Sequence, residues 1–168
     1  MSHAIEKLAT QLGHQLKQKK FRLATVESCT GGGLSYWITS VAGSSTWFER
    51  GFVTYTGQAK IDLVGVKSQT LATHGEVSEA TAKEMAEGGL QHSTADICIA
   101  ITGIAGPDGG SEQKPVGTVW IAWAFRQQPT IVEAYYFAGD RQNIRMQSME
   151  AALSKLLNGE FLPPSGEG

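Results

Sequence analysis

One turn near the amino end restricts the possible folds of this chain more than any other feature. The apolar run Leu23–Val26 predicts a short buried strand, and apolar residues at helical spacing from Leu34 onward predict a helix. Between the two segments stand a serine, a thiol, a second hydroxyl and three glycines, in the order Ser28-Cys29-Thr30-Gly31-Gly32-Gly33. A strand that passes into a helix through so few side chains lets a ligand approach the backbone closely. It also places Ser28 at the carboxyl end of a strand, where open α/β sheets put their ligands.

This segment alone leaves two interpretations open. In the first, the free N–H groups at the start of the helix hold an anion or a developing oxyanion beside Ser28. In the second, Ser28 only caps the helix, because serine is a favoured capping residue. The glycine spacing matches neither the phosphate-binding loop nor the dinucleotide-binding fingerprint.

The length and composition predict one globular domain. With 168 residues, 41% hydrophobic and 18% charged, the chain has enough apolar surface to fold without a metal or a disulfide. We expect a single domain over residues 1–160 and a flexible, proline- and glycine-rich tail over 161–168. No signal core or membrane-length apolar run is present, which predicts a cytoplasmic protein that does not bind membranes.

The net charge and the spacing of potential metal ligands argue against nucleic-acid binding and metal binding. The net charge of −2 and the absence of a basic stripe argue against a nucleic-acid partner. The two cysteines and four histidines show no metal-ligand spacing, and Asp108 is one carboxylate among glycines, so we expect no metal site. Cys98 lies inside an apolar run and is expected to be a small core residue.

The order of predicted elements indicates a three-layer α/β/α sandwich around a mixed, mostly parallel sheet. Strands are expected over 21–27, 47–55, 95–102, 118–126 and 130–138, with helices over 2–19, 31–41, 59–64, 78–91 and after Asp140. Ser78 is expected to cap the helix over 78–91, and the glycine-rich segment 103–117 is expected to be a functional loop.

Three loops that follow strands hold the candidate catalytic groups. If the strands are parallel neighbours, the segments 28–32, 54–60 and 102–110 converge at one edge of the sheet. Ser28, Tyr55 and Lys60 then meet there with no histidine nearby. A serine nucleophile without histidine can use a lysine base, as in Ser-Lys hydrolases. Burial or a cationic neighbour must first lower the lysine pKa from ~10.4 to roughly 7–8.

Each of these residues also has a structural interpretation. Tyr55 can orient Ser28 or Lys60 by a hydrogen bond, or it can simply be half-buried, while Lys60 can be a solvated helix residue. Cys29 is either a competing nucleophile or a thiol buried beneath the turn. Arg141 and Arg145 share a helix face and can clamp a phosphate or a carboxylate; alternatively, they form surface ion pairs with Asp140 or Glu150.

Several long motifs occur in the chain in the same order as in a known family. They are A-T-V-E-S-C-T-G-G (24–32), G-S-S-T-W-F-E-R-G-F-V-T-Y-T-G-Q-A (43–59) with Lys60, H-G-E-V-S (74–78), T-G-I-A-G-P-D-G-G (102–110), K-P-V-G-T-V (114–119) and G-D-R (139–141). Together they resemble the CinA C-terminal domain family over nearly the whole chain. The family often has Ser-Asn-Glu where this chain has Thr56-Gly57-Gln58, which adds a glycine beside Lys60.

The resemblance implies an activity and roles for particular residues. It implies metal-free hydrolysis of the carboxamide of nicotinamide mononucleotide to nicotinic acid mononucleotide and ammonia, without a cofactor, in the recycling of pyridine nucleotides by a homodimer. Ser28 would be the nucleophile, Lys60 the base, and Tyr55 an assisting group. The other assignments place the Thr30, Gly31 and Gly32 backbone at the oxyanion or amide, Thr102, Gly103 and Gly106 along the substrate, and Arg141 at the phosphate.

Two alternatives to an active enzyme remain. The chain can be a catalytically silent nucleotide-binding paralogue of the same family, which the Gly57 departure keeps open. A competence-related nucleic-acid partner is the third possibility, and the slightly acidic charge argues against it.

Overall fold

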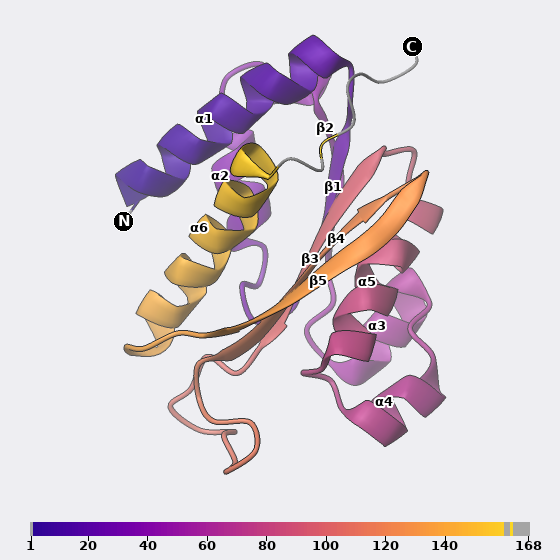
Figure 1. Ribbon diagram of the computed structural model, residues 1–168, viewed down its shortest axis with the longest axis vertical. Coiled ribbons are helices and arrows are strands. Elements are labelled where there is room, and N and C mark those ends of the chain that lie inside the picture. The colour runs from indigo at the N-terminus through magenta and orange to yellow at the C-terminus, as the bar shows by residue number, and fades with distance from the viewer. Residues whose placement is uncertain (1, 160–161, 163–168) are drawn as a thin grey trace.

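The computed structural model describes residues 2–159 and Leu162 (Figure 1). The described elements, in chain order, are α1 (Ser2–Lys19), β1 (Leu23–Glu27), α2 (Gly33–Thr39), a short 3₁₀ helix (Ser44–Thr46), β2 (Phe48–Val53), α3 (Gly57–Val64), α4 (Ser68–His74), α5 (Glu79–Gln91), β3 (Ile97–Gly103), β4 (Thr118–Phe125), β5 (Gln128–Tyr136) and α6 (Arg141–Asn158). The tail expected to be flexible over 161–168 lies outside the described residues except for Leu162, which packs partly buried against the core.

The strands form one five-stranded sheet in the order β2-β1-β3-β4-β5. β1 is parallel to both of its neighbours, β2 and β3, whereas β4 is antiparallel to both β3 and β5. β5 therefore runs in the same direction as the three parallel strands, and only β4 is reversed. This confirms the predicted mixed, mostly parallel sheet. The carboxyl ends of β1, β2 and β3 lie at the same edge, where the loops after them meet.

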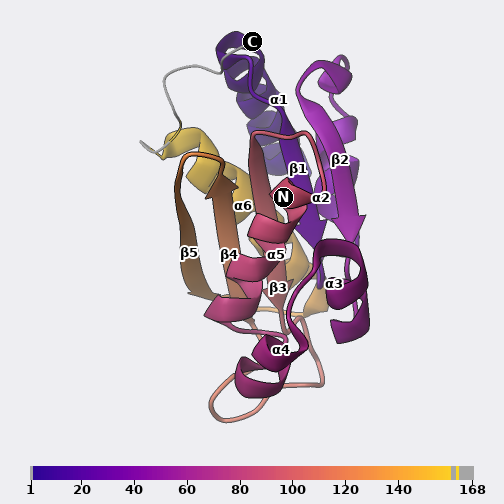
Figure 2. The ribbon, with the colours of Figure 1, turned by 90° about the vertical axis from the view of Figure 1, so that its right-hand side faces the viewer.

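Helices cover both faces of the sheet, which confirms the three-layer α/β/α architecture. α1, α2 and α6 lie on one face, and α3, α4 and α5 lie on the other (Figure 1). Figure 2 shows α5 packed along the middle of its face, with α3 and α4 beside the end that carries the loops after β1 and β3. Among the described helices, none is long and apolar enough to cross a membrane.

The two faces of the sheet are packed with side chains of different size. Alternation along β3 sends Ile97, Ile99 and Ile101 into the core beneath α1, α2 and α6, whereas Cys98 and Ala100 face α5. The small side chains on the α5 face let this helix approach the sheet closely. At Gly89 a Cβ atom would overlap the Cys98 thiol, so the helix needs glycine at this contact. Cys98 is therefore a small core residue, as expected.

Most predicted element boundaries shift by only a few residues, and α4 is an element that was not predicted. Ser78 caps α5 as expected, since its Oγ accepts a hydrogen bond from the Thr81 N–H at 3.2 Å. α4 has little apolar periodicity of its own. Its amino end is held instead by Glu84 of α5, which accepts hydrogen bonds from the Lys67 N–H at 2.9 Å and the Thr70 hydroxyl at 2.5 Å. A tertiary contact, invisible in local sequence, stabilises this helix.

Candidate active site

The loops after β1, β2 and β3 meet at a hollow of about 220 Å³. Ser28 follows β1, Tyr55 follows β2, and Thr102 and Gly103 end β3; all four line the hollow. Arg141 of α6 closes another side, and Glu76 of the loop between α4 and α5 completes the wall. The predicted convergence at one edge of the sheet is therefore formed. Thr30, Gly31, Gly32 and Gly106, also predicted as site residues, are not among the described residues that line the hollow.

Ser28 and Lys60 are in direct contact. The Lys60 ammonium nitrogen, Nζ, donates to the Ser28 hydroxyl at 3.0 Å and to the Thr54 carbonyl at 2.9 Å. The Ser28 hydroxyl in turn donates to the Tyr55 carbonyl at 3.2 Å, and that same carbonyl lies 3.3 Å from Nζ. Lys60 is completely buried, so the interpretation that it is a solvated helix residue is wrong.

Local structure directs Lys60 toward the turn. The Thr56 hydroxyl caps α3 by accepting from the Ala59 N–H at 3.1 Å, and this cap places Lys60 in the first turn of the helix. Helical side chains lean toward the amino end of their helix, here toward Ser28. Gly57 does not disturb this arrangement. A Cβ at Gly57 would make ordinary contacts with Leu71 at 3.4 Å and Glu76 at 3.5 Å.

Burial governs the protonation of Lys60. Removal from water is the largest influence on its pKa, which lies below the usual value of 10.5 because burial penalises the charged amine. The Glu76 carboxylate, 3.8 Å from Nζ, opposes this shift by favouring the charged form. Because the pKa is lowered, a larger fraction of Lys60 is uncharged at a given pH than of a solvated lysine. This arrangement gives Lys60 both the position and the electrostatic bias of a general base for Ser28.

The turn after β1 is stabilised by Glu27, which the sequence did not single out. Its buried carboxylate accepts hydrogen bonds from the Leu34 N–H at 2.8 Å and the Ser35 N–H at 2.9 Å. One of the two interpretations of this turn had these N–H groups at the start of α2 facing a ligand, and that interpretation is wrong because the Glu27 side chain occupies them. Ser28 is not the cap either, since the N-cap residue of α2 is Gly32.

The remaining amides of the turn define where an oxyanion can be held. The Gly31 N–H donates to the Ser28 carbonyl at 3.0 Å and the Gly33 N–H to the Thr30 carbonyl at 2.9 Å, so neither is available. Within the described part of the chain, the N–H groups of Cys29, Thr30 and Gly32 have no backbone acceptor. The first two directly follow Ser28, in the place where oxyanion donors follow a nucleophile.

Arg145 supports the turn from α6 and does not face the hollow. Its guanidinium donates from Nε to the Cys29 carbonyl at 3.0 Å and from Nη2 to the Thr30 carbonyl at 3.1 Å. The Cys29 carbonyl and the Thr30 N–H belong to one planar peptide group, so this contact also fixes the direction of that N–H. Sequence reasoning placed Arg145 either in an anion clamp with Arg141 or in a surface ion pair, and the structure shows neither role among the described residues.

Arg141 and Tyr55 meet at the rim of the hollow. Arg141 donates to the Gly106 carbonyl at 2.7 Å and to the Tyr55 phenol oxygen at 3.3 Å. Tyr55 is 57% exposed, and the hydrogen bond that its phenol could have formed with Ser28 or Lys60 is not present among the described residues. The contact with that pair comes from the Tyr55 backbone carbonyl. The two arginines therefore do not form one clamp, and Arg141 alone faces the hollow.

Cys29 is not equipped to compete as a nucleophile. Burial raises the pKa of its thiol to about 12, outweighing the opposing hydrogen bond and the nearby Arg145 charge. The thiol is thus protonated at neutral pH, which favours the interpretation of a group buried beneath the turn.

In the part of the chain that the structure describes, no cluster of three or more His, Cys, Asp or Glu side chains can hold a metal ion.

Glu76 is a site residue that sequence reasoning missed. Its carbonyl accepts a hydrogen bond from the Thr102 hydroxyl at 2.8 Å, and its carboxylate faces Lys60. The available signal was its position just before the Ser78 cap, inside the H-G-E-V-S motif.

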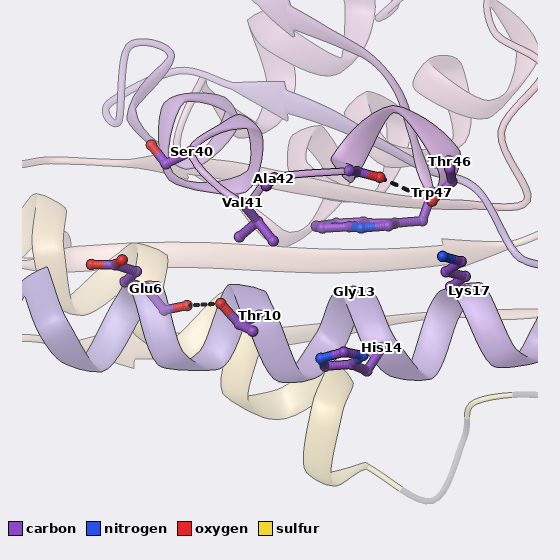
Figure 3. A pocket seen from close by; sticks show the side chains of 11 residues that line it. Glu6, Thr10, Gly13, His14, Lys17, Ser40, Val41, Ala42, Thr46 and Trp47 are labelled. Carbon is purple, nitrogen blue, oxygen red and sulfur yellow. Dashed lines mark hydrogen bonds between the residues drawn. The ribbon is translucent and has the colours of Figure 1, made fainter.

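A second hollow, of about 390 Å³, lies between α1 and the connection from α2 to β2 (Figure 3). It is near the start of β1, the opposite end of that strand from Ser28. The Trp47 ring forms its wall, and a Cβ at Gly13 would lie 2.6 Å from that ring, so the helix and the ring are closely packed. No residue predicted for the site lines this hollow.

Comparison with known proteins identifies the family. Residues 5–159 match the CinA C-terminal domain. The chain is 51% identical over 149 residues to nicotinamide-nucleotide amidohydrolase PncC of Escherichia coli (strain K12), covering 89% of this chain and 90% of that protein. It is 44% identical over 158 residues to nicotinamide-nucleotide amidohydrolase PncC of Enterobacter agglomerans, covering 94% and 96%.

A solved structure supports the same relationship. The competence/damage inducible protein CihA from Agrobacterium tumefaciens superimposes with a TM-score of 0.89 at 43% identity, over 92% of this chain and 96% of that one. The match extends from the first helix to the last, and the chain belongs to the CinA C-terminal domain family.

Proposed function

We propose that this protein hydrolyses the carboxamide of nicotinamide mononucleotide, giving nicotinic acid mononucleotide and ammonia. The observation that carries the proposal is the buried Lys60 amine 3.0 Å from the hydroxyl of Ser28, at a hollow large enough for a small ligand. Relatives that are 51% and 44% identical to this chain carry the name of that amidohydrolase. A serine paired with an uncharged lysine is suited to acyl transfer from an amide.

In the proposed reaction, Ser28 is the nucleophile and Lys60 moves the protons. The Ser28 oxygen attacks the amide carbon while Lys60 Nζ takes the hydroxyl proton, and the negative charge moves onto the amide oxygen. Lys60 then returns the proton to the nitrogen that leaves as ammonia, and an ester to Ser28 remains. A water molecule, deprotonated by Lys60, cleaves this ester to the acid and regenerates the Ser28 hydroxyl.

Backbone amides and Arg145 stabilise the oxyanion in this scheme. The N–H groups of Cys29 and Thr30 donate to the developing oxyanion, and Arg145 holds the peptide that carries the second of them. Gly31 and Gly32 contribute through their left-handed conformation, with φ of 59° and 98°, which lets the chain turn sharply after Ser28. This is a narrower role than direct contact with the substrate.

The nucleotide part of the substrate lies along the β3 side of the hollow. Thr102 and Gly103 line this side, and Gly106 holds Arg141 through its carbonyl. The Arg141 guanidinium retains N–H donors beyond those it uses, and it faces the 5′-phosphate in our proposal. Tyr55 assists by keeping Arg141 at the rim through its phenol oxygen.

We further propose that the protein works as a cytoplasmic homodimer in pyridine nucleotide recycling, without a nucleic-acid, membrane, metal or cofactor partner. The net charge of −2 supports the absence of a nucleic-acid partner. Size-exclusion chromatography with light scattering tests the dimer, and a mass equal to one chain contradicts it.

One assay separates the enzyme from a catalytically silent nucleotide-binding paralogue. Purified protein is incubated with nicotinamide mononucleotide, ammonia is measured by a coupled assay, and the acid product is identified by mass spectrometry. We expect both products in equal amounts. Binding of the nucleotide without ammonia release would favour the silent paralogue, and a binding measurement alone cannot make this distinction.

A further inference from the structure

Glu76 places a half-exposed carboxylate at the wall of the hollow, within ion-pair distance of Lys60. Its side chain is 54% exposed, and its Oε1 lies 3.8 Å from Lys60 Nζ. Of the described residues that line the hollow, Glu76 is the only carboxylate and Arg141 the only permanent cation. The Thr102 hydroxyl holds the Glu76 backbone at 2.8 Å, so the carboxylate belongs to a fixed part of the wall.

The protonation of Lys60 decides whether this carboxylate has a partner. Lys60 Nζ is the only cation within ion-pair distance of Glu76 in the described part of the chain. A lysine that acts as a base must be uncharged before it takes a proton. In that state Glu76 faces the hollow as an unpaired negative charge, and a positively charged ligand group beside it is favoured.

We infer that Glu76 recognises the positive charge of the pyridinium ring and makes the site selective for nicotinamide substituted on its ring nitrogen. This inference rests on the proposed function. Substitution at the ring nitrogen makes the ring a cation, whereas free nicotinamide and the dihydro form are neutral. The hollow would thus recognise both charges of the substrate, with Glu76 at the ring and Arg141 at the phosphate.

Covalent geometry brings the ring charge within range of Glu76. The amide carbon and the ring nitrogen of nicotinamide are separated by only three bonds. Lys60 Nζ lies 3.8 Å from Glu76 Oε1 and 3.0 Å from the Ser28 hydroxyl. Glu76 Oε1 therefore lies no farther from the Ser28 hydroxyl than the sum of these two distances. An amide seated on Ser28 therefore has its charged ring nitrogen within reach of Glu76.

The charge of the ring can be separated from its shape by a neutral isostere. Benzamide riboside 5′-phosphate has carbon in place of the ring nitrogen but keeps the carboxamide, the ribose and the phosphate. Affinities for this compound and for nicotinamide mononucleotide are measured by calorimetry in the Ser28→Ala variant, which removes turnover. The same titrations are then made with Glu76→Gln added, a change that keeps the side-chain shape and removes the charge.

We expect Glu76→Gln to weaken binding of nicotinamide mononucleotide about tenfold, and to change binding of the neutral isostere by less than about twofold. The matched control is Glu6→Gln in the same Ser28→Ala background. Glu6 is an exposed carboxylate at the second hollow, and its replacement changes the net charge equally without affecting either affinity.

The outcomes separate this inference from the function on which it rests. Suppose that the wild-type protein releases ammonia from nicotinamide mononucleotide, but Glu76→Gln weakens the binding of both ligands equally or of neither. The inference is then wrong and the proposed function stands. If the wild-type protein releases no ammonia and Ser28→Ala binds neither ligand, the proposed function fails, and the inference fails with it. Circular dichroism of each variant verifies that it is folded.

Discussion

Lys60 Nζ lies 3.0 Å from the Ser28 hydroxyl oxygen, although Ser28 follows β1 and Lys60 lies in the first turn of α3, and the lysine side chain is completely buried. The carbonyls of Thr54 and Tyr55 also accept hydrogen bonds from Nζ, at 2.9 and 3.3 Å. These carbonyls and the Glu76 carboxylate, 3.8 Å away, favour the charged amine, but burial is the larger influence and lowers the pKa of Lys60. The fold therefore provides a buried amine that is positioned by the backbone and biased toward its uncharged form.

Removing either member of this pair should abolish ammonia release. We expect Ser28→Ala and Lys60→Met each to lower kcat/KM for nicotinamide mononucleotide by at least about 10³-fold, because nucleophile and base act as a unit. Lys83→Met, which removes an exposed lysine on α5, is the matched control and should retain full activity. Ammonia release above a few per cent in either site variant, with the protein folded, would contradict the assignment.

Activity should fall as the pH is lowered through the pKa of Lys60. Only the uncharged amine accepts the Ser28 proton, and burial places this pKa below 10.5. The Glu76 carboxylate favours the charged amine, so Glu76→Gln should lower the Lys60 pKa further and move the acid limb of kcat/KM to lower pH. Profiles between about pH 5 and pH 10 test this prediction. A limb that stays in place or moves to higher pH would show that Lys60 is not the titrating group.

Thiol reagents should leave the enzyme active. With the Cys29 pKa raised to about 12 by burial, the reactive thiolate is scarcely populated at neutral pH. Burial likewise raises the pKa of the Cys98 thiol. We expect incubation with iodoacetamide at pH 7 to leave ammonia release unchanged over an hour, with no adduct in the mass spectrum of the folded protein. Time-dependent inactivation accompanied by alkylation of Cys29 would reopen the case for a cysteine nucleophile.

Arg145 should affect the chemical step more than binding. Arg145→Met removes the hydrogen bonds to the Cys29 and Thr30 carbonyls, so the Thr30 N–H is no longer held in one direction. We expect kcat to fall about 10- to 100-fold with little change in KM, and stability to fall by about 2 kcal/mol. Arg145→Lys, which restores one donor, should recover part of kcat. A large rise in KM with kcat preserved would instead indicate a substrate-binding role.

Arg141 should show the opposite pattern. Its guanidinium faces the hollow, and we expect Arg141→Met to raise KM for nicotinamide mononucleotide about tenfold through loss of the phosphate contact. Nicotinamide riboside, which lacks the phosphate, should be affected much less. Arg50→Met, at an exposed arginine of β2, serves as the matched control. Equal losses for nucleotide and nucleoside would place the phosphate elsewhere.

Local patterns in the sequence predicted much of this architecture because they report burial directly. The apolar runs of β1 and β3, the Ser78 cap and the strand-helix turn at Ser28 all depend on neighbours within a few residues. Local patterns did not reveal α4, because the amino end of this helix is held by Glu84 of α5, which lies outside the segment. Glu76 and Arg145 likewise owe their roles to partners distant in sequence.

The order of residues along the chain was enough to predict the α/β class, the converging loops and the residue types available for chemistry, of which serine and lysine without histidine were the most informative. What those residues do depends on contacts between distant parts of the chain. The burial of Lys60, the occupation of the α2 amides by Glu27 and the use of the Tyr55 carbonyl in place of its phenol all depend on approach through space. A pKa and a hydrogen bond are set by the surrounding atoms, and those atoms are brought together by packing and not by their order in the chain.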